Sequence, residues 1–359
     1  MMSRALSAGV ADGVATACGG PVPVGLATSV PLRGHRPRGV PAGSLFALVL
    51  PVAMLLCACG GGSEAGAREA SADHAEPSPA GHAATGSPVP VPPAIPTHAM
   101  SGTPDAMGEG IAIDMSRASE GIIMASSANQ PARVKLTVAC GQMVYQYDMP
   151  ADGTPIAVPA NMGSGFYHVA LMLNVEGNNY VEILSAERDV ALSSEFAPFL
   201  VPNEYCSYSE SSACVQEARR IAQGSSNQGD LARGICEYVM SRLEYDNEKA
   251  RACENATGYV PDPDSSLGEG KGICFDYASL CTSMFRSAGI PAKVVTGYIL
   301  PERTYHSWVE AYVDGQWQRY GLSVRGDKWS RLDVTLADGA DGDESLVPAE
   351  SEYEVRFVY

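Results

Sequence analysis

The fold of the C-terminal half is decided by residues 268–291, GEGKGICFDYASLCTSMFRSAGIP, in a chain of 359 residues. The glycine-rich beginning predicts a turn, and the apolar spacing that follows predicts a helix from about Cys274 to Ala288. Gly289 ends this helix, because glycine is the usual residue just past a helix C-terminus. Cys274 therefore lies at the helix N-terminus, where free backbone N–H groups and the helix dipole stabilise a thiolate. Cys281 lies further inside the same helix, and we assign it to the core.

A nucleophilic thiolate needs a neighbouring base, and only one histidine belongs to the same region as Cys274. The other five histidines lie elsewhere in the chain: His35, His74, His82, His98 and His168. His306 opens the run HSWVEAYVDGQW (306–317), which predicts a β-hairpin with its turn at Asp314–Gly315. On the first strand His306, Trp308 and Glu310 would share one face. Cys274 and His306 are therefore the candidate nucleophile and base.

Motifs between about residues 210 and 325 resemble the core of the transglutaminase-like superfamily. They are Gly272-x-Cys274-x-Asp276-Tyr277-Ala278, Gly289-Ile290-Pro291-Ala292, Val295-x-Gly297-Tyr298 and the run that starts at His306. The resemblance implies a papain-like α+β core with a Cys-His-Asp triad, in which Cys274 is the nucleophile and His306 the base. It implies a cysteine-dependent amide hydrolase, peptidase or acyltransferase. Hydrolysis of a peptide or cell-wall amide is expected over crosslinking, because bacterial members of the family are more often interpreted as peptidases.

The third triad residue departs from the family pattern. The orienting acid normally follows the hairpin tryptophan by four residues, in a Trp-x-x-x-Asp-Pro-Thr-like run, but Gly321 stands at that position after Trp317. A glycine cannot hold an imidazole ring in one tautomer. Asp327 and Asp333 are the candidates to replace the missing acid, and Tyr320 or a water molecule are further alternatives. Gly321 also keeps open a second function, that of a catalytically weak or inactive surface module that binds peptide or glycan.

Residues 109–202 have the period-two pattern of strands. Side chains alternate between polar and apolar over 133–138 and 144–148, and residues 166–173 form a more apolar run. We predict six to eight short strands in a β-sandwich. After residue 202 the apolar spacing becomes helical, over 215–222 and 231–243. The predicted class is therefore α+β, with a β-sandwich domain at 109–202 and a transglutaminase-like domain at 203–359.

The N-terminal residues predict export. Residues 45–56 form an apolar run that is too short to span a bilayer but suits the h-region of a signal peptide. The following Cys-Ala-Cys59-Gly resembles a bacterial lipoprotein signal, which implies a signal peptide at 1–59, lipidation of Cys59 and anchoring to the outer face of the cell membrane. An ordinary secretory signal cleaved near Ala58 is the alternative.

Two further expectations concern the N-terminal third. An n-region that began at Met1 would be far longer than usual, so we expect translation to begin at a non-Met codon near Val24, Val30 or Val40. Residues 60–108 contain much Gly, Ala, Ser and Pro and few large apolar side chains, so we predict a disordered tether.

Composition limits the partners. With 41 acidic and 24 basic residues the net charge is -17, which argues against nucleic-acid binding because phosphate neutralisation needs surplus Lys and Arg. The sequence has no CxxC pair for zinc, and the acidic run 338–345 lacks EF-hand spacing. We therefore expect no metal and no cofactor, and the expected partners are a peptide or peptidoglycan-like amide substrate and the membrane. Disulfides are permitted in an exported protein, and Cys206–Cys214 is our candidate pair.

Overall fold

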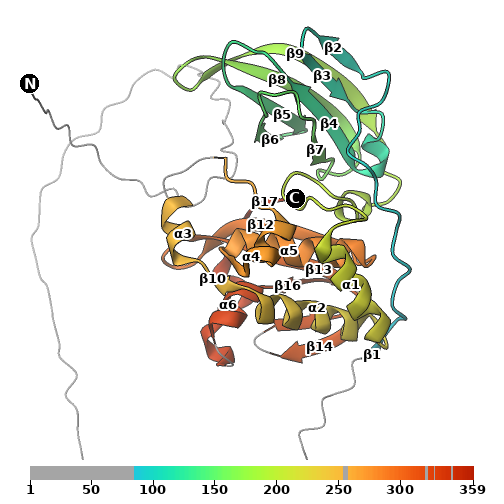
Figure 1. Ribbon diagram of the computed structural model, residues 1–359, viewed down its shortest axis with the longest axis vertical. Coiled ribbons are helices and arrows are strands. Elements are labelled where there is room, and N and C mark those ends of the chain that lie inside the picture. Colours follow the sequence, from blue (N-terminus) through green and yellow to red (C-terminus); the bar gives the residue numbers. More distant parts are fainter. Residues whose placement is uncertain (1–84, 254–257, 320–321, 327, 341–342) are drawn as a thin grey trace, which may run out of the picture. The chain divides into compact units, whose positions relative to one another are not determined.

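The computed structural model describes residues 85–253, 258–319, 322–326, 328–340 and 343–359 (Figure 1). The predicted signal peptide, Cys59 and the first part of the predicted tether lie outside these residues. Among the helices that are described, none is long and apolar enough to cross a membrane.

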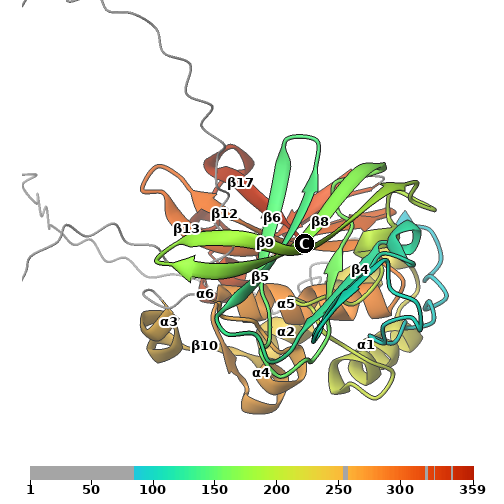
Figure 2. The same cartoon turned by 90° about the horizontal axis from the view of Figure 1, so that it is seen from above.

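Two four-stranded antiparallel sheets occupy the segment for which the sequence predicted a β-sandwich. In order across the first sheet, the strands are β2 (Ala106–Gly108), β3 (Ile111–Asp114), β4 (Ile122–Ser127) and β7 (Ile156–Pro159). In order across the second sheet, they are β6 (Met143–Asp148), β5 (Val134–Cys140), β8 (Gly165–Glu176) and β9 (Asn179–Val190) (Figure 2). Alternate residues such as Val134, Leu136 and Val138 are buried in the core, as the period-two pattern requires.

The remaining elements build the domain that carries the candidate site. Its helices are α1 (Ala213–Gly224), α2 (Gln228–Arg242), α3 (Asn247–Cys253), α4 (Pro263–Glu269), α5 (Cys274–Ser287) and α6 (Val334–Gly339). In order across its main sheet, the strands are β16 (Lys328–Leu332), β13 (Thr304–Val313), β12 (Ala292–Ile299) and β17 (Tyr353–Val358). The α+β class and the three predicted helices are confirmed. Asn227 caps α2, because its side chain accepts the Asp230 N–H.

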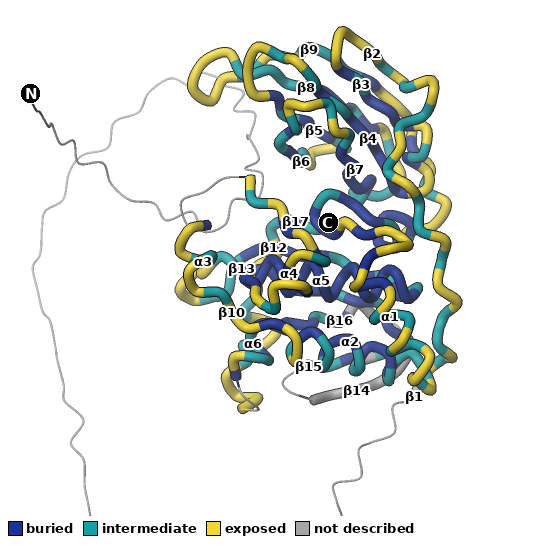
Figure 3. Tube along the Cα trace, viewed as in Figure 1, coloured by how far each residue is buried: buried dark blue, intermediate teal, exposed yellow. Residues whose placement is uncertain are grey.

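Helix α5 is the central element of this domain. All of its residues are buried (Figure 3), and it contacts β12 and β13 as well as α1, α2 and α4. An element surrounded on all sides by protein has little freedom to move. Cys274, the first residue of α5, is therefore held in a fixed position relative to the sheet.

The predicted hairpin at Asp314–Gly315 is wrong. Strand β13 pairs with β12 and β16, whereas β14 (Gly315–Arg319) pairs with β15 (Leu322–Arg325) and with β1 (Thr85–Gly86). The Asp314 N–H donates to Gln228 Oε1 of α2, and the Asp314 carboxylate accepts from the Ser87 hydroxyl. These contacts direct the chain away from the sheet after β13. Strands β14 and β15 are thus an inserted hairpin between β13 and β16.

The structure also corrects the predicted tether for residues 85–108, because these residues are ordered. β1 pairs with β14, and Val89 and Ile95 pack against the hydrophobic core. His98, which lies within the predicted tether, has its Nε2 atom buried. A few apolar side chains are enough to order this segment, because the folded domain already provides the surface on which they pack.

The predicted Cys206–Cys214 disulfide is wrong as well. Cys206 and Cys214 are free thiols, and both are buried. The Cys206 sulfur instead accepts a hydrogen bond from Arg286 Nη1 at 2.9 Å. Arg286 is itself fully buried and also donates to backbone carbonyl groups, so the sulfur contributes to satisfying a buried cation.

Candidate active site

Cys274 lies at the N-terminus of α5, as the sequence predicted, and its side chain is largely buried. The Asp276 carboxylate accepts the Ile273 N–H at 2.8 Å, which caps the helix one residue before the cysteine. Gly272 is required at the turn, because a Cβ atom there would lie 2.6 Å from the Asp276 Cβ. The turn and the cap together fix the direction in which the thiol leaves the helix.

A partly buried ion pair holds this helix end from the other side. Asp276 is fully buried, and its carboxylate pairs with Lys249 Nζ of α3 at 2.8 Å. The Tyr259 hydroxyl donates to the second oxygen of the same carboxylate. Lys249 also lies over the Tyr259 ring, 4.8 Å from its centre. Residues from α3 and from the segment before α4 thus anchor the first turn of α5.

His306 on β13 is the histidine next to Cys274. Its Nε2 atom lies 2.8 Å from Asp333 Oδ2, and both side chains are almost completely buried, with 6% and 1% of their residues' surface exposed. The Cys274 thiol interacts with the same imidazole ring through charge and hydrogen bonding. The Trp308 ring stacks beside His306 at 6.4 Å. Nucleophile, base and acid are therefore neighbours in the order that a thiol triad requires.

The electrostatics of this cluster favour an ionised histidine. Burial alone lowers the pKa of His306, but the negative charges of Asp333 and Cys274 and the hydrogen bonds to both residues raise the pKa to about 10. Burial likewise raises the pKa of Asp333, yet the charge of His306 and the hydrogen bonds that the carboxylate accepts outweigh it and lower that pKa. At neutral pH Asp333 is therefore a carboxylate and His306 an imidazolium.

Asp333 reaches His306 because of the strand pairing. Val309 of β13 lies opposite Leu332, the last residue of β16, and Asp333 follows directly. This pairing brings the end of β16 beside the part of β13 that carries His306. Asp333 Oδ1 also caps α6 by accepting the Leu336 N–H at 3.1 Å. The residue is thus fixed by β16 on one side and by α6 on the other.

The expected position of the acid after Trp317 was taken from the wrong tryptophan. Gly321 and Asp327 lie outside the described residues, and Trp317 belongs to the inserted hairpin. The sequence does contain a second tryptophan in the family spacing, since Trp329-Ser-Arg-Leu is followed by Asp333-Val-Thr. That repeated spacing is the signal that sequence reasoning missed.

The other candidate groups lie apart from this cluster. Cys281 is fully buried, and burial raises the pKa of its thiol well above the usual value, as expected for a core residue. His168 lies on β8, where Glu182 and Glu187 approach its ring at 3.8 and 4.0 Å. Within the described part of the chain there is no cluster of three or more side chains suited to a metal ion.

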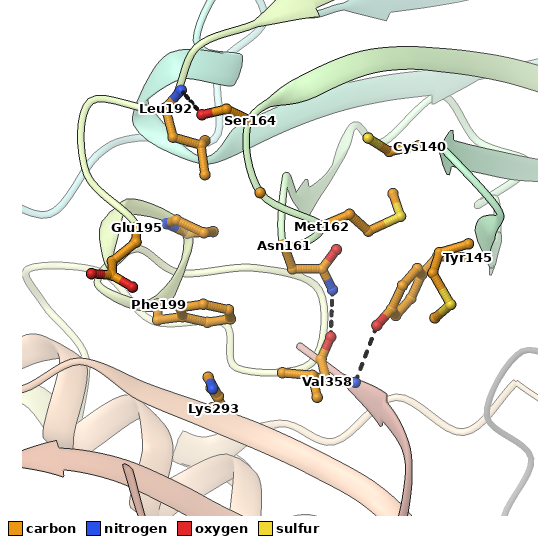
Figure 4. Close-up of a pocket in the computed structure, with 13 residues that line it drawn as sticks. Cys140, Tyr145, Asn161, Met162, Ser164, Leu192, Glu195, Phe199, Lys293 and Val358 are labelled. Carbon is orange, nitrogen blue, oxygen red and sulfur yellow. Dashed lines mark hydrogen bonds between the residues drawn. The ribbon is translucent and has the colours of Figure 1, made fainter. Parts of the chain in front are cut away.

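A cavity of about 540 Å³ lies between β5, β6 and the ends of β12 and β17 (Figure 4). Its lining includes Tyr145, Asn161, Phe199 and Lys293. The Val358 backbone closes one side, since its N–H donates to the Tyr145 hydroxyl and its carbonyl accepts from Asn161. Neither Cys274 nor His306 lines this cavity, so it is not part of the candidate active site.

Known proteins match parts of this chain. An uncharacterised protein of Mycobacterium leprae, ML0607, is 25% identical over 187 residues, which are 49% of this chain and 61% of that protein. YebA of Bacillus subtilis is 31% identical over 117 residues, 28% of this chain and 16% of that protein. The chain thus spans less than two thirds of the length of either relative. Red sea bream transglutaminase is 16% identical, with 62% of this chain and 49% of that chain covered at a TM-score of 0.29.

A family model matches a narrower part of the chain. Residues 216–322 match the model of the transglutaminase-like superfamily, and this segment contains both Cys274 and His306. Asp333 lies beyond its end, on the far side of the inserted hairpin. Residues 216–322 are therefore similar to the core of the transglutaminase-like superfamily.

Proposed function

We propose that this chain is a thiol-dependent acyl-transfer enzyme that hydrolyses a peptide or cell-wall amide bond. The observation that carries the proposal is the Asp333 carboxylate on the His306 ring, next to a thiol at a helix N-terminus. A cysteine buried only for packing needs no imidazolium beside it and no buried acid behind that imidazolium.

In the proposed reaction each group has a role. The Cys274 thiolate attacks the amide carbonyl carbon, and His306 gives its Nδ1 proton to the departing amine, which leaves a thioester on the sulfur. His306 then takes a proton from water, the resulting hydroxide attacks the thioester, and the carboxylic acid leaves as the thiolate reforms. Asp333 keeps a proton on Nε2 and so turns Nδ1 towards the thiol.

The same helix end offers a place for the oxyanion. The first N–H groups of a helix have no acceptor within the helix, and at α5 they belong to Cys274 and its neighbour Phe275. Such donors stabilise the negative oxygen of a tetrahedral intermediate. The alternative of an inactive binding module was based on Gly321, and the contact between the Asp333 carboxylate and the His306 ring supports the enzyme over that alternative.

A labelling experiment tests the proposal. Iodoacetamide is added at pH 5.5, and each cysteine is followed by mass spectrometry. Cys140, which is partly exposed and whose thiol pKa is raised by burial, serves as the internal reference. An ordinary thiol is about 0.1% ionised at this pH, so Cys274 should react at least about 100 times faster than Cys140. In His306→Ala this advantage should disappear.

The proposal fails if Cys274 reacts no faster than Cys140, or if His306→Ala leaves the Cys274 rate unchanged. Digestion of peptide and peptidoglycan fragments by the wild type, with Cys274→Ala as the matched inactive control, then identifies the amide that is cleaved. Amine incorporation in place of hydrolysis would show that the thioester is used for crosslinking.

We also propose that the chain is exported and held at the outer face of the membrane by a lipid on Cys59. The support is the sequence alone, in which the apolar run 45–56 precedes a cysteine followed by three glycines. Cys59→Ser should move the protein from the detergent phase to the aqueous phase in a phase-separation assay. Equal partitioning of both proteins would contradict the anchor.

A further inference from the structure

Tyr353, the first residue of β17, contacts the candidate triad from an element that carries none of its three members. Its hydroxyl donates to Asp333 Oδ2 at 2.7 Å. The same oxygen accepts from His306 Nε2 at 2.8 Å, while Oδ1 accepts the Leu336 N–H. Both carboxylate oxygens are therefore occupied, and Oδ2 receives two donors.

We propose that Tyr353 is a positioning residue that keeps Asp333 ionised and fixed in the orientation that His306 requires. The inference rests on the proposed function, because it assigns Tyr353 to the same thiol–imidazole chemistry. It adds a residue that lies outside the segment of the family match and outside every motif recognised in the sequence.

The ring of Tyr353 is held so that its hydroxyl cannot turn away. Its edge packs on the Trp308 ring, with centres 5.0 Å apart and planes at 74°. The Arg331 guanidinium lies over its face, 3.8 Å from the ring centre. The backbone of Tyr353 is paired with Ile299 of β12. A positive charge over the ring also makes the phenol a stronger donor, which favours a carboxylate as its partner.

The groups around Asp333 determine the direction in which its pKa is shifted. Asp333 faces His306 of β13 and Tyr353 of β17. His306 in turn interacts with Cys274 of α5. Tyr353 in turn faces Arg331 of β16 and Glu352. Burial raises the pKa of Asp333, and the charge of His306 together with the hydrogen bonds from His306, Tyr353 and the Leu336 N–H lowers it.

Loss of the Tyr353 hydroxyl removes one of the contributions that keep Asp333 ionised. Asp333 then takes up a proton at a higher pH than in the wild type. A neutral Asp333 no longer stabilises the imidazolium, and a thiol beside a neutral imidazole is a weaker nucleophile than one beside an imidazolium. The pH below which Cys274 stops reacting should therefore rise.

The test uses the full chain and the rate of Cys274 alkylation by iodoacetamide between pH 4 and 9. Tyr353→Phe keeps the ring contacts with Trp308 and Arg331 and removes only the hydroxyl. Tyr298→Phe is the matched control, because Tyr298 lies on the adjacent strand β12 and its hydroxyl accepts from Arg356 at 3.2 Å. The acid limb is the part of the pH profile in which the Cys274 alkylation rate falls as the pH is lowered. In Tyr353→Phe this limb should shift to higher pH by about one pH unit, which makes labelling about tenfold slower at a fixed pH on that limb. The alkaline plateau should stay unchanged, and Tyr298→Phe should follow the wild type.

Asp333→Asn and His306→Ala distinguish failure of the Tyr353 inference from failure of the proposed function. If both change the acid limb but Tyr353→Phe does not, the inference about Tyr353 is overturned and the proposed function stands. If Tyr353→Phe lowers the whole profile without moving the limb, the residue is only structural and the inference is again overturned. If His306→Ala leaves the profile unchanged, the proposed function itself fails.

Discussion

Replacing Asp333 by Asn should remove much of the pH dependence of stability that His306 creates. Asn is nearly the same size, and it remains a good N-cap, so it can still accept the Leu336 N–H at the start of α6. What the substitution removes is the negative charge beside His306 Nε2. The comparison is made with Cys274→Ala in both proteins, so that titration of the thiol does not contribute.

The magnitude follows from the pKa of His306. A rise from 6.5 to about 10 is about 3.5 pH units, which at about 1.36 kcal/mol each corresponds to about 5 kcal/mol as an upper bound. Cys274 contributes part of this rise, so Asp333 supplies less than the whole. Because the folded pKa is raised, the stabilisation is fully present below pH 6.5 and is lost as the pH rises through about 10.

Urea unfolding at pH 6, 8 and 10 measures the effect, with the free energy of unfolding extrapolated to zero urea. The difference in this free energy between the protein that retains Asp333 and the Asp333→Asn variant should be about 2–4 kcal/mol at pH 6 and should shrink steadily towards pH 10. A difference that stays constant from pH 6 to 10 would refute the reasoning, because it would mean that Asp333 stabilises the fold without acting on the ionisation of His306.

Two substitutions elsewhere test the packing around the site. Lys249→Met should lower the free energy of unfolding by about 3–5 kcal/mol, because Asp276 is left buried without its cation, and adding Asp276→Asn should recover much of the loss in the same urea assay. Gly297→Ala should lower the melting temperature by the equivalent of about 3 kcal/mol, since its Cβ would overlap the Glu354 carbonyl oxygen and lie 2.8 Å from Trp308 Cη2. Gly224→Ala, which meets open space at the end of α1, is the control and should change stability by less than about 0.5 kcal/mol; equal melting temperatures for the two alanine variants would contradict the close packing at Gly297.

The parts of the fold that the sequence predicted are those with local signals. The bounds of α5 follow from a glycine-rich turn, one run of apolar residues and a Gly-x-Pro end, all within residues 268–291. The strands of the N-terminal sheets follow from alternation within each strand. Cys274 and His306 were found because each lies inside such a local pattern.

The parts that the sequence left open or predicted wrongly depend on contacts between distant residues. Asp333 reaches His306 only because β13 pairs with β16 across an inserted hairpin, and hydrophobic periodicity does not reveal which strands pair. Lys249 and Tyr259 belong to the site through their contact with Asp276, although nothing near them in sequence indicates a charge partner. Residues 85–108 were predicted to be disordered from their own composition, but they fold on the surface of the adjacent domain.

The two oxygens of Asp333 bind different parts of the fold. Fraying of α6 and loss of the His306 ring orientation are therefore coupled. Oδ1 holds the first turn of α6 through the Leu336 amide, while Oδ2 holds the imidazole. If the first turn of α6 frays, the carboxylate is released on one side and the ring loses its fixed orientation. Hydrogen exchange at the Leu336 amide therefore reports on the histidine without any substrate, and its protection should vary with the ionisation of His306.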